Sequence, residues 1–542
     1  MIQYLKKFEK QVRERTDVPA LCDYGGLSYT YGEVASAIEQ YHLFFAAAGV
    51  RKGQKIALCA RSSARWAIAF LAVNTYGAVI VPILADFTPE GISHLTNHSE
   101  SVLLITEPEI WKRMYQTDVP LLKGVISARA DSLLWGTERV KGAWSSRKKL
   151  FAELYPEGFD AKSVEYELDN PMDLAIINYT SGTSGDPKGV MLTFNAMSDI
   201  VQYCQDNIGN EPDTLVSNLP LAHMYGLAME FVYPCCTGYT IYFLGKLPTP
   251  SLLLESMQTI KPSILITVPL VIEKVYGTLI APQLRTKSAK AIKNVPGLRL
   301  AFYSSLGKKV LMDMGGRIRQ IIIGGAPLNF DVESDFHKLG IPCVIGYGMT
   351  EACPLICLEK PSGYVPGSCG KPIHKVRIAS PDPERIPGEI QTKGPNLCIG
   401  YYKNPEADVA ARTYDGWFRT GDLGIMDEDG NVFIRGRIKA LILSSTGQNI
   451  YPEEVEAVVM RSHRVQECLV LSKAGKIVAM VYPRPEAAET LVSEEAHEAM
   501  TEEIRTLANA NLPLFSQIAT VEIVDSPFER TAKGSIKRHL YQ

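Results

Sequence analysis

The sequence predicts an α/β protein: a large N-terminal domain of layered α/β subdomains with a small β-rich section, followed by a small α+β C-terminal domain. A strand-like run at residues 55–60 (KIALCA), a helical pattern from Ser62 to Tyr76 and a second run at 77–83 (GAVIVPI) alternate as in parallel sheets. At 542 residues the chain exceeds one hydrophobic core, so at least two domains are expected. After Gly370, short strand-like runs with turn residues replace the alternation.

The other elements of the large domain follow in order along the chain. A charged helical segment opens the sequence, and residues 101–106 (SVLLIT) add a strand. The segment from about 124 to 170 is polar and weakly periodic, so we expect an insertion there before the core resumes. Strand-like apolar runs then recur, with helix-like stretches between them, at residues 173–179, 214–219, 263–268 and 318–325.

The second half of the chain contains a basic segment and a domain boundary. Residues 271–316 are rich in Lys and Arg, which favours solvated amphipathic helices; a basic patch facing an anionic membrane surface is the alternative. Short strands are expected at 388–402 and 430–437. A boundary near Arg437–Lys439 gives domains at 1–437 and 438–542, the second an α+β unit of plausible domain size.

Composition narrows the class of protein. The 56 basic and 59 acidic residues give a net charge of −3, which carries no electrostatic signature of nucleic-acid binding. The eleven cysteines show neither a CxxC pair nor a His/Cys metal spacing, as is usual in a reducing cytosol. The charged N-terminus lacks an apolar signal core, and no run of about 18 apolar residues appears. We therefore expect a cytoplasmic protein, with peripheral contact at the inner membrane surface left open.

The stretch from Tyr179 to Val190 (YTSGTSGDPKGV) carries the strongest chemical signal. Three glycines alternate with three hydroxyl side chains, and Lys188 follows. Glycines let backbone N–H groups turn toward an anion, hydroxyls add donors, and a lysine supplies a positive charge. The stretch lacks the Gly-Lys-Ser/Thr ending of the common P-loop. A flexible surface loop is the alternative, but the flanking apolar strands favour a polyphosphate site at a strand end.

A second motif is IGYGMTEACP at residues 345–354. Tyr347 lies between glycines and can cover a purine ring, whereas Thr350 and Glu351 offer hard oxygen ligands for Mg²⁺ beside phosphates. Taken alone, the motif also fits a turn with a packed tyrosine. Just upstream, an apolar strand runs into Gly324–Gly325, where backbone can approach a ligand closely.

Two further stretches offer polar side chains in loops. Asp422, in a predicted Gly-flanked turn (GWFRTGDLG), can accept two hydrogen bonds from ribose hydroxyls, and Arg437 can donate to ribose or phosphate oxygens. His223 and Tyr225 lie in LPLAHMYG, at a strand-to-loop exit. An Asp in a turn and a lone His are more often structural, so the signal lies in the combination of stretches.

Together, in this order, the four stretches resemble those of the adenylate-forming superfamily, which includes acyl-CoA synthetases, peptide-synthetase adenylation domains and luciferases. The resemblance runs from about residue 20 to the C-terminus. Within that superfamily, four segments resemble the long-chain fatty acid–CoA ligase branch: LPLAHMYG, EKVY (273–276), GGAPLN and KNPEA (403–407).

The resemblance implies a two-step reaction with ATP, Mg²⁺ and CoA. A fatty carboxylate attacks the α-phosphate to give acyl-AMP and pyrophosphate, and the CoA thiolate then displaces AMP. The resemblance also implies that the C-terminal domain is a mobile lid that turns about Lys439 between the two steps. The phosphate-binding residues it implies are Thr180, Ser181, Gly182, Thr183, Ser184, Gly185 and Lys188.

The resemblance assigns the rest of the nucleotide site as well. Thr350 and Glu351 would serve phosphate and metal, with Thr180 as the other metal ligand, and His223 would line the acyl entry. The residues implied for adenine and ribose are Gly325, Ala326, Pro327, Tyr347, Gly348, Asp422 and Arg437.

One position departs from the family pattern. The C-terminal motif Gly-Lys-Ile-x-Arg is represented by TAKGSIKR, with Ser535 where the family has the lysine that meets the carboxylate and α-phosphate. Lys533 and Lys537 lie two positions away on either side, and in an extended segment they share a face with Ser535 without occupying its position. Three explanations are open for this serine. A neighbouring lysine takes over after a local shift; or the protein is slow at adenylation or mainly runs the thioester step; or the serine is an engineered change or a sequence error.

Three functions compete at this point. The first is a fatty acid–CoA ligase, and the second is a ligase that loads an acyl group onto a carrier protein. The third is an acyl-AMP or nucleotide-binding protein that has lost catalysis, which Ser535 would favour and the retained Thr350–Glu351 pair disfavours. The motifs define neither acyl chain length nor oligomeric state.

Overall fold

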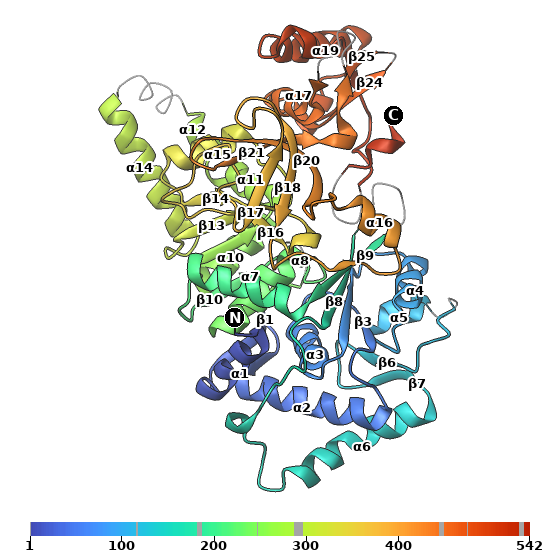
Figure 1. The fold of residues 1–542 in the computed structure, drawn as a ribbon. Helices are drawn as coiled ribbons and strands as arrows, with labels where there is room; N and C mark the ends of the chain where they lie inside the picture. Colours follow the sequence, from blue (N-terminus) through green and yellow to red (C-terminus); the bar gives the residue numbers. More distant parts are fainter. Residues whose placement is uncertain are drawn as a thin grey trace. The chain divides into compact units, whose positions relative to one another are not determined.

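The computed structural model describes residues 2–114, 118–180, 187–245, 248–286, 296–443, 449–473, 475–530 and 536–541 (Figure 1). The chain divides into two compact units. The first comprises Met1–Pro327, Phe336–Tyr364 and Lys393–Ala410, and the second comprises Leu328–Asp335, Val365–Thr392 and Ala411–Gln542. Residues 411–437 thus belong to the same compact unit as the C-terminal region.

An eight-stranded sheet forms the centre of the first unit, in the order β19-β9-β8-β4-β3-β5-β6-β7. The consecutive strands β8, β4, β3, β5 and β6 are parallel to one another. At the two ends of the sheet the pairing is antiparallel, for β19 and β9 at one end and for β7 at the other. The strands are β3 (Lys55–Cys59), β4 (Val79–Ile83), β5 (Leu103–Thr106), β6 (Gly124–Ser127), β7 (Leu133–Gly136), β8 (Leu174–Thr180), β9 (Lys188–Thr193) and β19 (Gly400–Tyr401).

The predicted strand–helix–strand unit is confirmed. The helix between β3 and β4, α3 (Ala64–Thr75), begins at Ser63, whose hydroxyl accepts a hydrogen bond from the backbone N–H of Trp66. All but one of the α3 side chains are buried, as expected for a helix covered on both sides. Helices α4 (Pro89–His98) and α5 (Pro108–Met114) flank β5 along the chain.

The expectation of an insertion at residues 124–170 is wrong in part. β6 and β7 extend the central sheet, and every residue of β6 is buried. The polar character belongs to α6 (Glu138–Leu154), which packs against α2 (Tyr31–Ala48); the two helices lie side by side in Figure 1. The sequence did not reveal these strands because each has only two or three apolar residues, interrupted by glycine or serine, in a polar segment.

Two smaller sheets complete the first unit. One has the order β10-β11-β1-β2, and the other has three parallel strands in the order β12-β13-β14. The strands are β1 (Pro19–Asp23), β2 (Ser28–Thr30), β10 (Thr214–Ser217), β11 (Thr240–Phe243), β12 (Ile264–Thr267), β13 (Gln320–Ile323) and β14 (Cys343–Ile345). Their helices include α1 (Tyr4–Glu14), α7 (Phe194–Asn207), α9 (Tyr233–Thr237), α10 (Pro250–Ile260), α11 (Pro269–Leu279), α12 (Ala281–Leu284) and α14 (Pro296–Asp313). α15 (Phe330–Lys338) has residues in both units.

The basic segment 271–316 is helical where it is described, in α11, α12 and α14, and residues 287–295 lie outside the described residues. In the part of the chain that the structure describes, no helix is long and apolar enough to cross a membrane.

The second unit contains two sheets. The first has the order β17-β18-β20-β21, and the second, β24-β25-β26, packs with helices over a core that includes Val459, Val470 and Ile504. The elements are β17 (Lys375–Ala379), β18 (Gly388–Lys393), β20 (Phe418–Met426), β21 (Val432–Arg437), α17 (Pro452–Val459), β24 (Val465–Lys473), β25 (Lys476–Pro483), α18 (Pro485–Ala488), α19 (Glu494–Asn509) and β26 (Thr520–Ile523). A two-stranded ribbon joins β22 (Ile442–Leu443) and β23 (Asn449–Ile450).

The α/β fold class is confirmed, with one rearrangement. Residues 388–402 were expected to form part of a small β-rich section, but only β18 joins that sheet. β19 pairs instead with β9 of the central sheet, through Gly400↔Met191 and Tyr401↔Val190. The chain between them, 394–399, therefore leads from one sheet to the other.

Candidate active site

The predicted phosphate loop connects two antiparallel strands. The last pair of the β8–β9 ladder joins Thr180 to Lys188, and the Thr180 hydroxyl donates to the Lys188 carbonyl at 3.5 Å. The strands expected on both sides of the loop are confirmed. Five of the predicted phosphate ligands lie outside the described residues, namely Ser181, Gly182, Thr183, Ser184 and Gly185.

Tyr401, on β19, brings two predicted site residues together. Its hydroxyl donates to Oε1 of Glu351 at 2.8 Å. The Nζ of Lys188 lies 5.2 Å from the centre of the same ring, within the range of a cation–π contact. Burial, and then the charge of Glu351, raise the pKa of Tyr401, so its hydroxyl stays protonated and donates. One tyrosine thus holds the candidate metal carboxylate and the candidate phosphate lysine in place.

The backbone around Glu351 is fixed independently of its side chain. Glu351 lies in a single 3-10 turn, Thr350–Ala352, and is 8% exposed. Its carbonyl accepts from the N–H of Cys398 at 2.8 Å, and the Asn396 amide donates to the carbonyls of Ala352 and Leu355. The segment that leads into β19 therefore braces the turn that carries Thr350 and Glu351.

A second polar cluster holds the β8 end of the loop. The Tyr179 hydroxyl lies 2.7 Å from Nδ1 of His98, at the end of α4. Glu100, two residues on, accepts from the Tyr402 hydroxyl at 2.7 Å and pairs with Lys403 at 3.0 Å. These contacts tie the strand that precedes the loop to the segment that follows β19.

The predicted adenine residues follow two neighbouring parallel strands. Gly325–Pro327 come after β13 and Tyr347 comes after β14; the strands pair through Ile323↔Ile345. Ligands of open α/β sheets bind beyond the carboxyl ends of such strands. Gly325, with φ of +87°, Ala326 and Pro327 are exposed, whereas Tyr347 is 7% exposed. The edge offers open backbone with a packed aromatic ring beside it.

Position 348, next to Tyr347, requires glycine for a steric reason. It pairs with Leu355 in a two-stranded ribbon, β15 (Tyr347–Gly348) with β16 (Leu355–Cys357). A Cβ at this position would lie 1.8 Å from the carbonyl oxygen of Pro354. Only glycine fits without a backbone shift, and the ribbon sets the position of the Thr350–Ala352 turn.

His223 lies at the start of α8 (Met224–Gly226), which continues into a π-helical turn, Leu227–Val232. Its backbone N–H donates to the Pro220 carbonyl, and the Asn178 amide donates to the neighbouring Ala222 carbonyl at 2.9 Å. The His223 loop is therefore attached to β8, two residues before Thr180.

Glu230, which the sequence did not single out, is the buried support of this loop. Its carboxylate accepts from Ser217, from the backbone and amide of Asn218, and from the backbone of Leu219, at 2.7 to 3.2 Å. Burial nevertheless raises its pKa to about 8. The Asn218 amide also donates to Ile266 of β12, so the network joins β10, β12 and the π-helical turn.

The second unit contains the predicted ribose residues as a cross-strand pair. Asp422 of β20 lies opposite Arg437 of β21, and the Arg437 Nε is 3.0 Å from Asp422 Oδ1. The expectation that Asp422 lies in a turn is wrong. The flanking glycines form an irregularity inside one nine-residue strand: Gly421 has φ of +73°, and the register shifts between Leu423 and Gly424.

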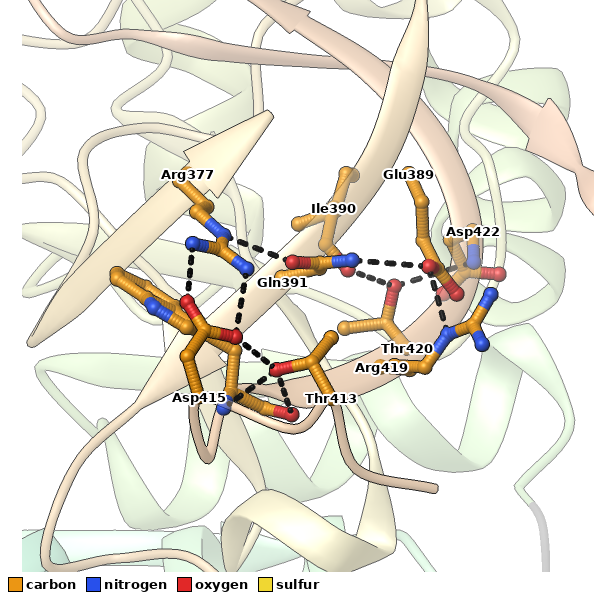
Figure 2. A network of polar contacts seen from close by, with 10 residues as sticks. Arg377, Glu389, Ile390, Gln391, Thr413, Asp415, Arg419, Thr420 and Asp422 are labelled. Atoms are coloured by element: carbon orange, nitrogen blue, oxygen red, sulfur yellow. Dashed lines mark hydrogen bonds and ion pairs between the residues drawn. The ribbon is translucent and has the colours of Figure 1, made fainter. Parts of the chain in front are cut away.

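A chain of polar contacts crosses the sheet that carries Asp422 (Figure 2). Asp415 pairs with Arg377, whose Nε donates to Gln391; the Gln391 amide donates to Glu389, which pairs with Arg419 at 2.9 Å. The Thr420 hydroxyl donates to the Ile390 carbonyl and accepts from the N–H of Asp422.

The predicted hinge residue, Lys439, lies in a 3-10 turn, Ile438–Ala440, directly after β21. Together with Arg538 it lines a cavity of about 290 Å³ within the second unit. Arg538 donates to both Glu456 oxygens at 2.6 Å and to the Val470 carbonyl at 3.1 Å. Lys533 and Ser535 lie outside the described residues, but Arg538 anchors the chain three residues beyond Ser535.

The next question is which side chains of the candidate site could hold a metal ion. Among the described residues, no three or more His, Cys, Asp and Glu side chains gather closely enough to hold a metal ion. Mg²⁺ characteristically binds through one or two carboxylates together with phosphate oxygens and water. The Glu351 carboxylate, held by Tyr401, is a ligand of the type that such a magnesium–phosphate complex takes.

Comparison with protein families identifies the group to which this site belongs. A family model described as "AMP-binding enzyme" matches residues 8–402. The chain belongs to the AMP-binding enzyme family. A second model, described as "AMP-binding enzyme C-terminal domain", matches residues 439–542. The predicted resemblance to the adenylate-forming superfamily is confirmed, and the protein is an adenylate-forming acid–thiol ligase.

Several curated AMP-binding enzymes are similar along most of the chain. "Probable acyl-activating enzyme 16, chloroplastic" of Arabidopsis thaliana is 28% identical, with 92% of this chain and 81% of the relative covered. "Long-chain-fatty-acid--[acyl-carrier-protein] ligase AEE15, chloroplastic" of the same plant is 27% identical, with 93% and 79% covered. "Long-chain-fatty-acid--CoA ligase 1" of Homo sapiens is 28% identical, with 83% and 68% covered.

Solved structures of similar fold cover the whole chain. ATP-bound MatB from Rhodopseudomonas palustris superimposes with a TM-score of 0.77 at 23% identity, covering 100% of this chain and 98% of that one. The anthranilate CoA ligase AuaEII in complex with anthranoyl-AMP gives 0.78 at 20% identity, covering 100% and 96%. At this level of identity the likeness establishes the fold of an AMP-binding enzyme.

Proposed function

We propose that the protein is an ATP-dependent long-chain fatty acid–CoA ligase that works through an acyl-AMP intermediate. The contact of Tyr401 with both Glu351 and Lys188 carries the proposal. It places a carboxylate and an ammonium group around one rigid ring, beside the end of a Gly- and hydroxyl-rich loop. This arrangement suits the neutralisation of a magnesium–polyphosphate, and the similarity to fatty acid–CoA ligases supports the acyl substrate.

In the first half-reaction, a carboxylate oxygen of the fatty acid attacks the α-phosphorus of ATP. The bond from the α-phosphorus to the bridging oxygen breaks, and pyrophosphate leaves with both bonding electrons. We assign the β- and γ-phosphates to Thr180, Lys188 and the loop between them. Mg²⁺, held by Glu351 and Thr180 with Thr350 beside them, would neutralise charge on the phosphate oxygens. The protein supplies position and charge rather than a covalent step.

The nucleoside would be held by the remaining residues of the predicted set. We assign adenine to the exposed backbone of Gly325–Pro327 and to the Tyr347–Gly348 ribbon, and the ribose hydroxyls to Asp422 and Arg437. Asp422 Oδ1 lies 3.0 Å from Arg437 Nε, so a carboxylate acceptor and a guanidinium donor are side by side for the ribose hydroxyls. His223 would line the acyl entry, on the loop that Glu230 supports.

In the second half-reaction, the CoA thiolate attacks the acyl carbonyl carbon. The bond from this carbon to the phosphate oxygen breaks, AMP leaves, and the thiol proton is released to solvent. We propose that residues 438–542 act as a mobile lid that turns at Lys439 between the two steps, with 1–437 as the nucleotide-binding domain.

A pyrophosphate-release assay tests the proposal directly. Acids of two to eighteen carbons are supplied with ATP and Mg²⁺, with and without CoA, and acyl-CoA is measured in parallel by mass spectrometry. We expect release that depends on the acid and is greatest for long chains, with acyl-CoA formed only when CoA is present. Glu351→Gln should lower release by roughly two orders of magnitude, since it removes the metal carboxylate; Glu359→Gln is the matched control.

A second candidate is a ligase that transfers the acyl group to a carrier protein. It is favoured by the similarity to the acyl-carrier-protein ligase of Arabidopsis thaliana over 93% of this chain. Release of pyrophosphate without acyl-CoA, followed by acylation of a phosphopantetheinylated carrier protein, would select it. No release with any acid would select the third candidate, a nucleotide-binding protein impaired at Ser535.

A further inference from the structure

A cavity of about 160 Å³ lies in the first unit, between α2, the end of α6 and the segment that follows it. None of its lining residues belongs to the nucleotide or acyl sites proposed above. It is enclosed by aromatic rings, carboxylates and one imidazole. The residues that matter chemically are Glu39, His42, Tyr155, Phe159, Glu165 and Tyr166.

Two of the rings form a right-angled corner. The ring centres of Tyr155 and Phe159 are 5.0 Å apart, and their planes meet at 88°. Phe151 supports both, at 5.0 Å from Tyr155 and 5.7 Å from Phe159. Perpendicular aromatic faces beside a carboxylate are the arrangement in which proteins hold quaternary ammonium groups, because each face presents the negative part of the ring quadrupole.

The charges at the cavity favour a cation. Glu39 reaches it from α2, with 25% of its side chain exposed, and its charge is, after burial, the next cause of the raised pKa of Tyr155. Burial lowers the pKa of His42 to about 4, so its ring carries no positive charge at pH 7. Arg13 approaches Glu165 at 3.6 Å, but it also pairs with Glu9 at 3.2 Å. Glu39 therefore supplies negative charge that no described lysine or arginine on the lining neutralises.

Tyr166 adds an unsatisfied donor. The residue is 5% exposed, its ring stacks on Phe8 at 5.7 Å, and its backbone N–H donates to Glu9. Its buried hydroxyl has no hydrogen-bond partner among the described residues. Buried hydroxyls are normally paired, so an ordered water or an acceptor group of a ligand would complete this one.

We propose that this cavity binds a small organic cation, an alkylammonium group that carries a hydroxyl or a similar acceptor. The ammonium group lies in the corner of Tyr155 and Phe159 next to Glu39, and the acceptor meets the Tyr166 hydroxyl. A cavity of about 150 Å³ holds a molecule the size of benzene, so the ligand has few heavy atoms. Choline and ethanolamine have this size and chemistry.

The test compares choline with its neutral isostere, 3,3-dimethyl-1-butanol, by isothermal titration calorimetry on the full-length protein. We expect choline or ethanolamine to bind at least tenfold more tightly than the isostere. Ligand-observed NMR should show the choline N-methyl resonance shifted upfield, since the methyl groups lie over ring faces. Equal affinity for choline and the isostere, or no binding of either cation at millimolar concentration, overturns the proposal.

Substitutions locate the site. Glu39→Gln keeps the size of the side chain but removes the charge, so we expect choline affinity to fall at least tenfold. Glu157→Gln, an exposed carboxylate on the same segment, is the matched control and should bind as the wild type does. A Glu39→Gln protein that is folded by circular dichroism and binds choline with unchanged affinity contradicts the site. The comparison with the isostere on the unaltered protein decides the matter if the variant does not fold.

Discussion

The hydroxyl of Tyr401 donates a 2.8 Å hydrogen bond to Oε1 of Glu351, across fifty residues of sequence. The bond fixes the carboxylate that we assign to Mg²⁺, while the ring lies below Lys188. Tyr401→Phe removes the bond and keeps the ring. A hydrogen bond to a charged group contributes roughly 1.5–3 kcal/mol, so kcat/KM for pyrophosphate release should fall about 10- to 100-fold.

The control for this variant is Tyr402→Phe. Tyr402 is the next residue on the chain, but its hydroxyl donates to Glu100. Tyr402→Phe should therefore leave kcat/KM for pyrophosphate release within about twofold of wild type. The apparent Mg²⁺ requirement should rise in Tyr401→Phe alone, because the metal carboxylate is then less well positioned. Identical magnesium titrations for the two variants would argue against a positioning role.

Asp422 supplies the second prediction. Its side chain is 8% exposed and pairs with Arg437, so Asp422→Asn weakens both the ion pair and the proposed acceptor for ribose hydroxyls. We expect KM for ATP to rise about tenfold, in line with the loss of one charged hydrogen bond. The control is Asp415→Asn, in the polar chain of Figure 2. It alters the partner of Arg377 instead of the partner of Arg437, and it should leave KM for ATP unaltered.

The comparison of ATP with 2′-deoxy-ATP sharpens this test. The wild type should prefer ATP, and Asp422→Asn should lose most of that preference. If the variant discriminates between the two nucleotides as well as the wild type does, Asp422 does not contact the 2′-hydroxyl.

The third prediction concerns Ser535, where the family has a lysine. Ser535→Lys restores a positive charge toward the α-phosphate, so we expect single-turnover pyrophosphate release to rise by roughly tenfold or more. Lys537 is held by Glu529 at 3.3 Å, which leaves Lys533 as the neighbour able to substitute in the natural protein. Lys533→Met should therefore lower release, and Lys537→Met should not. Equal acyl-AMP formation by Ser535→Lys and wild type would refute the idea.

Glu230 gives a prediction about pH. Burial raises its pKa to about 8 from an ordinary value of 4.5, so the folded protein holds a proton that the unfolded chain releases between these pH values. Its contribution to stability is therefore complete below pH 4.5 and is lost as pH rises toward 8. The slope is at most about 1.4 kcal/mol per pH unit, the value for one proton.

Chemical denaturation of Glu230→Gln between pH 5 and 7.5 checks this expectation. The variant should be less stable at low pH, because an amide cannot satisfy the donors of Ser217, Asn218 and Leu219 as a carboxyl does. Its stability should also depend less on pH than that of the wild type. Glu255→Gln, at an exposed carboxylate, is the control; parallel curves for Glu230→Gln and wild type would contradict the raised pKa.

Local patterns predicted the elements well where they are long and apolar. β8, β9 and the helix α3 follow from runs of buried side chains, and the stretch around Lys188, together with three others, indicated the family. β6 (GVIS) and β7 (LLWG) were missed because each has only two or three apolar residues, interrupted by glycine or serine, in a polar segment. Asp422 was placed in a turn because Gly421 and Gly424 have the composition of one, although the strand accommodates them as an irregularity.

The residues that position the site were not predictable in this way. Tyr401 meets Glu351 only because β19 returns to the central sheet, and nothing in the residues around position 401 announces that contact. Glu230 and Glu456 resemble ordinary acidic residues in sequence, yet distant segments bury Glu230 and half-bury Glu456, and burial raises the pKa of both. Such contacts depend on tertiary packing, which a local pattern does not contain.

The pairing of β19 with β9 has a consequence for synthesis of the chain. β9 ends at Thr193, but the strand that covers its outer edge arrives only with Gly400 and Tyr401. Until these residues leave the ribosome, the nascent chain presents an open strand edge, which is a template for pairing with other chains. Translation products that stop before residue 400 should therefore be prone to aggregation, and chaperones should engage the nascent protein during this interval.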